Sequence, residues 1–171
     1  MSDSLMTPAD VYDACADTWG RPSLDPCWHP ASPVRPVTAF CLPLNLLAWN
    51  LNGMNQCREI DGVNVVAGDG LDLDWGVARH GWTWLNPPYS APGPWLQRMR
   101  RGAALVKLDP STRWWEQTLR PGVTAIGLFN KRLKYPRTDG GKQMTANFPS
   151  AIILYNMGLR PALPVTWMRK L

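Results

Sequence analysis

The sequence predicts an α/β fold with a mostly parallel sheet and helices on both faces. Apolar runs of strand length, such as residues 103–108 and 123–129, alternate with segments of helical periodicity. Three predicted strands also end in a polar or proline-containing turn: Asp25-Pro26, Asp69-Gly70 and Asn86-Pro87-Pro88-Tyr89. Ligands bind beyond the carboxyl ends of the strands in such sheets, so we expect these turns to face one crevice.

Length and composition predict a single domain over residues 1–171. The chain is long enough for one hydrophobic core, and no repeat, low-complexity tract or linker divides it. Its 10 Trp predict a core of large aromatic side chains. The net charge of +5 favours a polyanionic partner such as nucleic acid, although many basic proteins bind none.

The cysteines and histidines argue against a zinc site, because they show no C-x-x-C pair and no other ligand spacing. They are Cys15, Cys27, Cys41, Cys57, His29 and His80. Acids at positions 69, 72 and 74 do not match the spacing of a calcium loop, so we expect no metal. The chain carries no secretory signal and no apolar run near the ~18 residues of a membrane span. We therefore expect a cytoplasmic protein with reduced thiols and no membrane contact.

The N-terminal part is predicted to begin with a helix. Thr7-Pro8-Ala9-Asp10 has Thr in the N-cap position and Pro at the first helical position, and Gly20 marks the end of the helix. A short strand then ends at Asp25-Pro26, and a turn-forming role is the plain alternative for Asp25. Residues 28–38 contain recurrent Pro and predict a loop over the surface or over a ligand.

The rest of the chain contains further elements of both kinds. Residues 39–51 fit a short helix, or a strand and turn with Trp49 buried, and Asn52-Gly53 fits a turn. Strands are predicted at residues 62–67, 82–85, 103–108, 123–129 and 148–155, with one more possible in the tail 161–171. Helices are predicted at residues 94–101 and 113–119. A basic segment, residues 130–137, precedes the strand at 148–155.

The apolar run at residues 82–85 stops at Asn86-Pro87-Pro88-Tyr89. Two successive prolines fix φ and remove two backbone donors, so a rigid turn follows the strand. The Asn86 side-chain oxygen and a proline carbonyl are both acceptors, and two converging acceptors suit an amino group with two hydrogens. They would hold its nitrogen near sp³ with the lone pair directed at an electrophile. The Tyr89 ring offers a face for a flat heterocycle.

This turn resembles the catalytic motif of the S-adenosylmethionine-dependent amino methyltransferases. Within that group, the layout of residues 6–158 resembles the phage-type DNA N-6-adenine methyltransferases. The motifs that carry this resemblance are Thr7-Pro8, Leu24-Asp25-Pro26, Asp69-Gly70-Leu71, Asn86-Pro87-Pro88-Tyr89-Ser90, Trp114-Trp115 and residues 132–135 and 148–151. The resemblance implies a Rossmann-like methyltransferase fold. It also implies transfer of the methyl group of S-adenosyl-L-methionine to the exocyclic amino group of adenine in DNA.

The resemblance further implies roles for individual residues. Those expected at the cofactor are Thr7 and Pro8 near its methionine end, Asp25 and Pro26 in the cofactor loop, and Asp69 beside its adenine or ribose. Those expected to hold an adenine flipped out of the duplex are Asn86, Pro87, Pro88 and Tyr89. Those expected at DNA phosphates are Lys131, Arg132, Lys134 and Arg137. A solvated loop is the alternative for these four basic residues.

The chain departs from many methyltransferases in its cofactor loop. Residues 25–30 contain no Gly, so contacts there must come from side chains. Asp61 is a candidate for the ribose hydroxyls. No segment is long enough for a separate target-recognition domain, which predicts a short or relaxed recognition sequence read by loops.

Two other functions fit the same turn. A protein glutamine N5-methyltransferase would use it in the same way, because an amide nitrogen also presents two hydrogens, but the basic charge favours DNA. A catalytically silent DNA-binding or cofactor-binding module of the same fold is the other alternative, and the strained Asn-Pro-Pro-Tyr turn weighs against it. A phage-encoded enzyme would act in the host cytoplasm.

Overall fold

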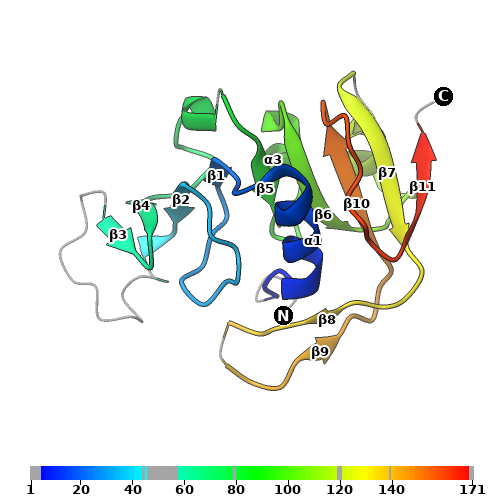
Figure 1. Ribbon diagram of the computed structural model, residues 1–171. Helices are drawn as coiled ribbons and strands as arrows, with labels where there is room; N and C mark the ends of the chain where they lie inside the picture. Colours follow the sequence, from blue (N-terminus) through cyan, green and yellow to red (C-terminus); the bar gives the residue numbers. More distant parts are fainter. Residues whose placement is uncertain are drawn as a thin grey trace.

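The computed structural model describes residues 5–43, 45, 58–78, 80–118, 121–138 and 140–169. Figure 1 shows the arrangement of the elements. The helices are α1 (Ala9–Trp19), α3 (Gly93–Arg98), α4 (Arg113–Thr118) and the 3-10 helix η2 (Trp75–Ala78). The strands are β1 (Leu24–Asp25), β2 (Thr38–Cys41), β3 (Arg58–Ile60), β4 (Val63–Ala67), β5 (Thr83–Leu85), β6 (Gly102–Lys107), β7 (Val123–Phe129), β8 (Lys134–Tyr135), β9 (Met144–Thr145), β10 (Ser150–Tyr155) and β11 (Val165–Arg169).

Within the described residues, the strands form a nine-stranded sheet in the order β11-β7-β10-β6-β5-β1-β2-β4-β3, and β8 and β9 form a separate hairpin. The neighbours β4, β2, β1, β5 and β6 are parallel. From β1 the chain proceeds through β2 and β4 toward one edge, whereas β5 and β6 lie on the other side of β1. The pair β1 and β5 is therefore a topological switch point, where the carboxyl ends of the strands leave a crevice.

The α/β class is confirmed, but the expectation of a mostly parallel sheet is wrong. Within the nine-stranded sheet of the described residues, four strand pairings are parallel and four are antiparallel. The reversal follows from the path after β7. The chain passes through the hairpin β8–β9 and re-enters the sheet beside the end of β6, where Ser150 pairs with Lys107. A strand that enters from that end runs antiparallel to its neighbours without a crossover connection.

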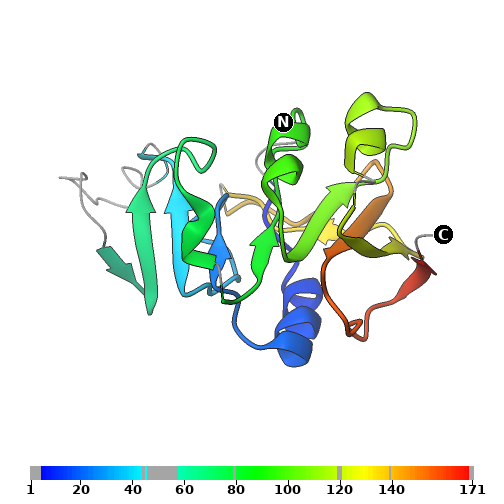
Figure 2. The same ribbon diagram turned by 90° about the horizontal axis from the view of Figure 1, so that it is seen from above.

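Helices cover both faces of the sheet, as predicted. Figure 2 shows α1 on one side of the strands and α3 and α4 on the other. Alternate residues of β6 enter two separate cores: Leu105 packs with Cys15 of α1, and Val106 packs with Trp95 of α3. The β10 residues divide in the same way. Both faces of the central strands are thus buried, which explains their continuous apolar runs.

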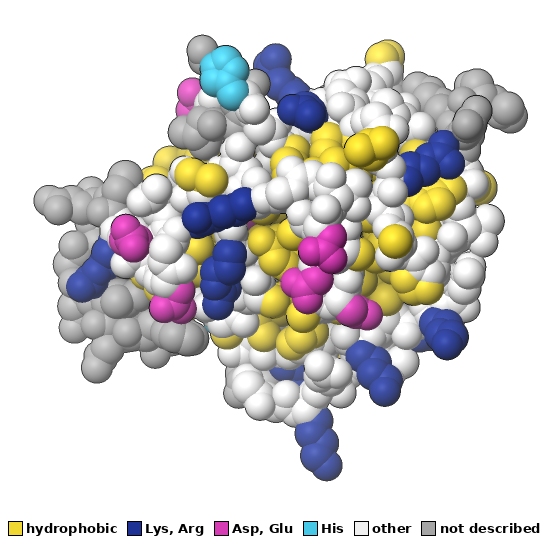
Figure 3. All heavy atoms as spheres, viewed as in Figure 1, with side chains coloured by type: hydrophobic (Ala, Val, Ile, Leu, Met, Phe, Trp, Pro, Cys, Tyr) yellow, Lys and Arg dark blue, Asp and Glu magenta, His cyan; other side chains and the backbone are white. Residues whose placement is uncertain are grey.

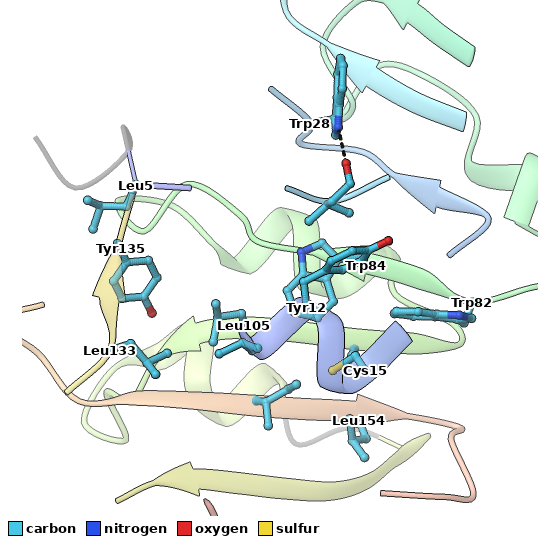
Figure 4. Close-up of a cluster of buried hydrophobic side chains, with 14 of the residues drawn as sticks. Leu5, Tyr12, Cys15, Trp28, Trp82, Trp84, Leu105, Leu133, Tyr135 and Leu154 are labelled. Atoms are coloured by element: carbon cyan, nitrogen blue, oxygen red, sulfur yellow. Dashed lines mark hydrogen bonds between the residues drawn. The ribbon is translucent and has the colours of Figure 1, made fainter. Parts of the chain in front are cut away.

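The first core contains much of the aromatic material in the chain. Figure 4 shows Tyr12 and Cys15 of α1 beside Trp84 of β5, with Tyr135 of β8 beyond Leu105. Trp84 is fully buried, and its ring meets that of Tyr12 edge-on at 6.1 Å. The prediction of a core of large aromatic side chains is confirmed for this cluster.

The predicted start of the first helix is wrong by one position. Pro8, and not Thr7, is the N-cap of α1, and no side chain caps this end. The Thr7 hydroxyl instead accepts a hydrogen bond of 3.0 Å from Nε1 of buried Trp84. The end of the helix is confirmed, because Gly20 has φ 75° and its N–H bonds to the carbonyl of Ala16. The Thr7 hydroxyl is therefore bonded to Trp84 and does not cap the helix.

Most other predicted elements are confirmed within a few residues. The strand predicted at 123–129 matches β7, and the tail adds β11. For residues 39–51 the sequence allowed either a helix or a strand and turn. The structure shows a strand, β2, at the start of this range. The predictions for Trp49 and for Asn52-Gly53 concern residues outside those that the structure describes.

The hairpin β8–β9 packs against the N-terminal segment, which we define as residues 5–7. The backbone N–H of Met6 donates to the carbonyl of Pro136 at 3.0 Å, and Leu5 forms an antiparallel bridge with Arg137. The basic segment of the sequence is thus part of a hairpin attached to the start of the chain.

Candidate active site

A cavity of about 620 Å³ lies beyond the carboxyl ends of β1, β4 and β5. All three turns predicted to share a crevice contribute to it, through Asp25-Pro26, Asp69-Gly70 and Asn86-Pro87-Pro88. The end of β2 adds Phe40. The prediction that these strand ends meet is confirmed. The volume is typical of sites for cofactors and small molecules.

The Asn86 amide is fixed by two hydrogen bonds. Its Nδ2 donates to the carbonyl of Leu5 at 3.2 Å, and its Oδ1 accepts from the hydroxyl of Tyr89 at 2.9 Å. The Leu5 carbonyl can only accept, so these partners define which side of the amide carries the oxygen. Oδ1 has a second lone pair, which stays available for a ligand that reaches the cavity.

Tyr89 lies behind Asn86 and not against the cavity. Its ring meets Phe148 at 5.2 Å and Tyr135 at 5.9 Å, both edge-on. Burial raises the pKa of the Tyr89 hydroxyl well above 10, with the neighbouring Tyr135 as a further cause, so this hydroxyl stays protonated as a donor. The hydroxyl of Tyr89 thus supports Asn86 in the structure, and the stacking of a flat heterocycle on the Tyr89 ring stays a prediction.

Asp25 carries a buried carboxyl at the end of β1. It is 3% exposed, and its Oδ1 accepts a hydrogen bond of 2.9 Å from the N–H of Cys27. Burial raises the pKa of this carboxyl to about 7, and the Cys27 hydrogen bond lowers it in part. Across the described residues the one ion pair joins Lys107 and Asp109, so Asp25 has no cationic partner there. A cationic ligand in the cavity would compensate this carboxylate.

The loop after β4 brings backbone close to the end of β1. Asp69 accepts a hydrogen bond of 2.8 Å from the N–H of Leu71. This bond forms a turn and gives a structural role to one of the three acids at positions 69, 72 and 74. A Cβ on Gly70 would meet the carbonyl oxygen of Pro26 at 2.1 Å and the ring of Trp95 at 2.8 Å. Although the Asp25 loop contains no Gly, the close backbone approach is supplied here by Gly70.

The two N-terminal cofactor candidates lie in different places. Thr7 lines the cavity, together with Leu5 and Met6, whereas Pro8 does not. Asp61 lies in the turn between β3 and β4, at the amino end of β4. That end is opposite to the cavity, so the expectation that Asp61 contacts a ribose is wrong.

The four predicted DNA contacts belong to the hairpin and its flanks. Lys131, Arg132 and Lys134 are exposed, and Arg137 is half-buried beside Leu5. Thr138, the next residue, lines the cavity. In Figure 3, Lys and Arg side chains project at the lower edge of the molecule, where the hairpin lies. A basic surface therefore leads to the rim of the cavity.

The described residues contain no group of three or more His, Cys, Asp or Glu that could hold a metal ion. In the same part of the chain, no helix is long and apolar enough to cross a membrane.

Several cavity residues were not predicted from the sequence. They include Met6, Cys27, Trp28, His29, Ser32, Phe40, Leu42, Asn45, Leu71, Ala91, Trp95 and Thr138. Two sequence signals covered some of them: Cys27, Trp28 and His29 belong to the expected cofactor loop at residues 25–30, and Ser32 belongs to the Pro-containing loop predicted over the surface or over a ligand. Burial raises the pKa of the Cys27 thiol well above 9, with Asp25 and Asp69 as further causes, so the protonated thiol is favoured.

Comparison with known proteins identifies the family. The family model described as DNA N-6-adenine-methyltransferase (Dam) matches residues 63–166, which is more than half of the chain. The chain therefore belongs to the DNA N-6-adenine-methyltransferase (Dam) family, and the resemblance inferred from the sequence motifs is confirmed. The matched region contains the Asn86-Pro87-Pro88-Tyr89 turn and the basic hairpin.

The DNA N-6-adenine-methyltransferase of Haemophilus phage HP1 (strain HP1c1) is 26% identical to the chain over 94 residues. The aligned region covers 50% of this chain and 53% of the phage protein, so the chain spans about half the length of this relative. No solved structure matches the chain.

Proposed function

We propose that this protein is a DNA adenine N6-methyltransferase that uses S-adenosyl-L-methionine. The observation that carries the proposal is the Asn86 amide, which is held between Leu5 and Tyr89 with one acceptor lone pair left at the cavity. Family membership and the basic hairpin at the cavity rim support adenine in DNA as the substrate.

The strand order supports a Rossmann-like methyltransferase fold. If β1, β2, β4, β5, β6 and β7 are numbered in chain order, their spatial order is 3-2-1-4-5-6, with antiparallel β10 inserted before the last strand. Doubly wound nucleotide-binding sheets have this order and bind ligands at the switch point between strands 1 and 4. Here that point is the cavity between β1 and β5.

The cavity residues fit the proposed cofactor. S-adenosyl-L-methionine supplies an electrophilic methyl group on a cationic sulfur, and its amino group adds a second positive charge. Asp25 offers a buried carboxyl without a cationic partner among the described residues, and Asp69 adds an acid at the same cavity. The rings of Trp28, Phe40 and Trp95 line the cavity and would cover apolar parts of the ligand.

The reacting amino group would be held by the turn after β5. Oδ1 of Asn86 would accept from one of its hydrogens and the carbonyl of Pro87 from the other. The nitrogen lone pair would then face the methyl group, and the N–CH₃ bond would form in line as the S–CH₃ bond breaks. The proton leaves the nitrogen afterwards, so no base is needed in advance. Positioning and electrostatics provide the catalysis, and the adenine has to leave the base stack to reach the turn.

Labelled methyl transfer separates this proposal from its alternatives. Purified protein is incubated with labelled S-adenosyl-L-methionine and either duplex DNA or a protein extract, and N6-methyladenine is identified in hydrolysed DNA. The proposal expects label in adenine of DNA with the wild type and its loss with Asn86→Ala. Label in glutamine would favour the protein methyltransferase. Cofactor binding without transfer to either substrate would favour the silent module.

A further inference from the structure

Arg98, at the end of α3, binds three successive parts of the loop after β4. Its guanidinium donates to the carbonyl oxygens of Gly70 at 3.3 Å, of Leu71, and of Leu73 at 2.6 Å. One side chain thus gathers three carbonyls that belong to one loop. Arg98 has no carboxylate partner within ion-pair distance among the described residues, so its charge is satisfied by these backbone dipoles.

Trp75 completes the contact from the far end of the loop. The Arg98 guanidinium lies 5.1 Å from the centre of the Trp75 ring, close enough for a cation–π interaction. Nε1 of Trp75 donates to the Gly70 carbonyl at 2.7 Å, so this oxygen receives two donors. The Trp75 ring also packs against Trp95 of α3 at 6.4 Å. Arg98 and Trp75 together tie the loop to α3.

The loop that they hold is a wall of the proposed cofactor cavity. Gly70 and Leu71 line that cavity, and Gly70 is pressed against the carbonyl of Pro26 on the opposite loop. Arg98 does not line it; it lines a separate cavity of about 990 Å³ together with Arg100, Arg101 and Asn156. Any effect of Arg98 on a bound cofactor therefore passes through the Gly70 and Leu71 backbone.

We infer that Arg98 is a positioning residue for the cofactor, which sets the Gly70 wall without touching the ligand. This inference rests on the proposed function. The contact uses both terminal nitrogens of the planar guanidinium, because Nη1 donates to the carbonyls of Gly70 and Leu71 and Nη2 donates to the carbonyl of Leu73. A lysine ammonium keeps the charge and has three donors, but all of them are on one atom, so it cannot occupy the positions of Nη1 and Nη2 together.

The test compares Arg98→Lys with Arg101→Lys in the full chain. Arg101 also lines the second cavity, but among the described residues its side chain donates to one carbonyl, that of Gly81 at 3.4 Å. Affinity for S-adenosylhomocysteine is measured by calorimetry, KM and kcat by labelled methyl transfer to DNA, and backbone exchange by mass spectrometry. We expect Arg98→Lys to weaken binding and raise the cofactor KM about tenfold, to leave kcat at saturation within twofold, and to speed exchange in residues 69–76. Arg101→Lys should match the wild type in all three.

Two results would overturn the inference: wild-type affinity in Arg98→Lys, or a lower kcat with unchanged affinity. If Arg98→Lys does not fold, Trp75→Phe replaces it, because it removes the bond to Gly70 and keeps an aromatic ring for Arg98. Trp75→Phe should weaken binding in the same direction, and unchanged binding would count against the inference. A wild type that binds no S-adenosylhomocysteine would instead overturn the proposed function, and the Arg98 role with it.

Discussion

The hydroxyl of Tyr89 donates a 2.9 Å hydrogen bond to Oδ1 of Asn86, the atom expected to receive the substrate amino group. The same amide donates through Nδ2 to the carbonyl of Leu5. Asn86 is therefore oriented from both sides before any ligand arrives. Pre-organised acceptors of this kind need no rearrangement during reaction, which is how positioned dipoles contribute most to rate.

Asn86→Ala should lower the turnover number by roughly a hundredfold or more, because it removes the acceptor for the amino group. Affinity for S-adenosylhomocysteine should stay within a few-fold, since the other cavity residues are unchanged. The measurement is labelled methyl transfer at saturating cofactor and DNA, with calorimetry for binding. Full activity in this variant would remove Asn86 from the mechanism.

Tyr89→Phe should affect mainly the turnover number, whereas Tyr89→Ala should also reduce the stability of the protein. The Phe variant loses the hydroxyl and its bond to Asn86 but keeps the ring contacts with Phe148 and Tyr135, so we expect a loss in kcat of about tenfold or less with little change in stability. The Ala variant also removes the ring from this cluster and should reduce the free energy of unfolding by about 2–4 kcal/mol. Thermal unfolding and initial rates separate the two effects. Equal stability of both variants would contradict this assignment.

Asp25→Asn should change how stability depends on pH. Burial raises the pKa of the Asp25 carboxyl from 3.8 to about 7, so its protonated form is favoured in the folded state. The contribution of the Asp25 carboxyl to the free energy of unfolding is therefore fully present below about pH 4 and is lost as pH rises through about 7. The stability of Asp25→Asn relative to the wild type should increase by about 2–4 kcal/mol over this range. Denaturant unfolding at pH 4, 6 and 8 tests this, and a difference that does not vary with pH would refute it.

The same variant should bind the cofactor more weakly at high pH. Wild-type affinity for S-adenosyl-L-methionine should rise as pH increases through about 7, because the ionised carboxylate of Asp25 attracts a cation. In Asp25→Asn this rise should be smaller, as measured by calorimetry at the same pH values.

Gly70→Ala should damage the cavity wall. The new Cβ would meet the Pro26 carbonyl oxygen at 2.1 Å, so the two loops must separate. We expect a loss of about 2 kcal/mol in stability and a clear loss of cofactor affinity. Gly158→Ala is the matched control, because no atom lies within 4 Å of its added Cβ. Similar behaviour of the two variants would show that the close approach at Gly70 is unimportant.

Replacement of Lys131, Arg132 and Lys134 by Gln should weaken binding to duplex DNA. Each lost phosphate contact should reduce the slope of log affinity against log salt by about one. Affinity for S-adenosylhomocysteine should not change, because these side chains are exposed and lie outside the cavity. Arg58→Gln on β3, at the far edge of the sheet, is the control. If the triple variant retains the wild-type salt slope, the hairpin is not a phosphate-binding surface.

The sequence by itself determined the features that depend on neighbouring residues. Apolar runs predicted the central strands, and Gly20 marked the end of α1. Two successive prolines required a turn after β5, and parallel strands required the ends at Asp25, Asp69 and Asn86 to share one edge of the sheet. These predictions hold because φ restrictions and strand direction are local properties.

Only the tertiary structure decided what those residues contact. Thr7 pairs with Trp84 across 77 positions, and Asn86 pairs with Leu5 across 81. The Arg98 contacts with the loop after β4, and the enclosure of Tyr89 by Tyr135 and Phe148, likewise join distant parts of the chain. Residue spacing contains no information on such pairs, because they form only once the sheet order brings the segments together. The motif thus predicted the kind of nitrogen that the turn would hold, and the fold decided how that turn is supported.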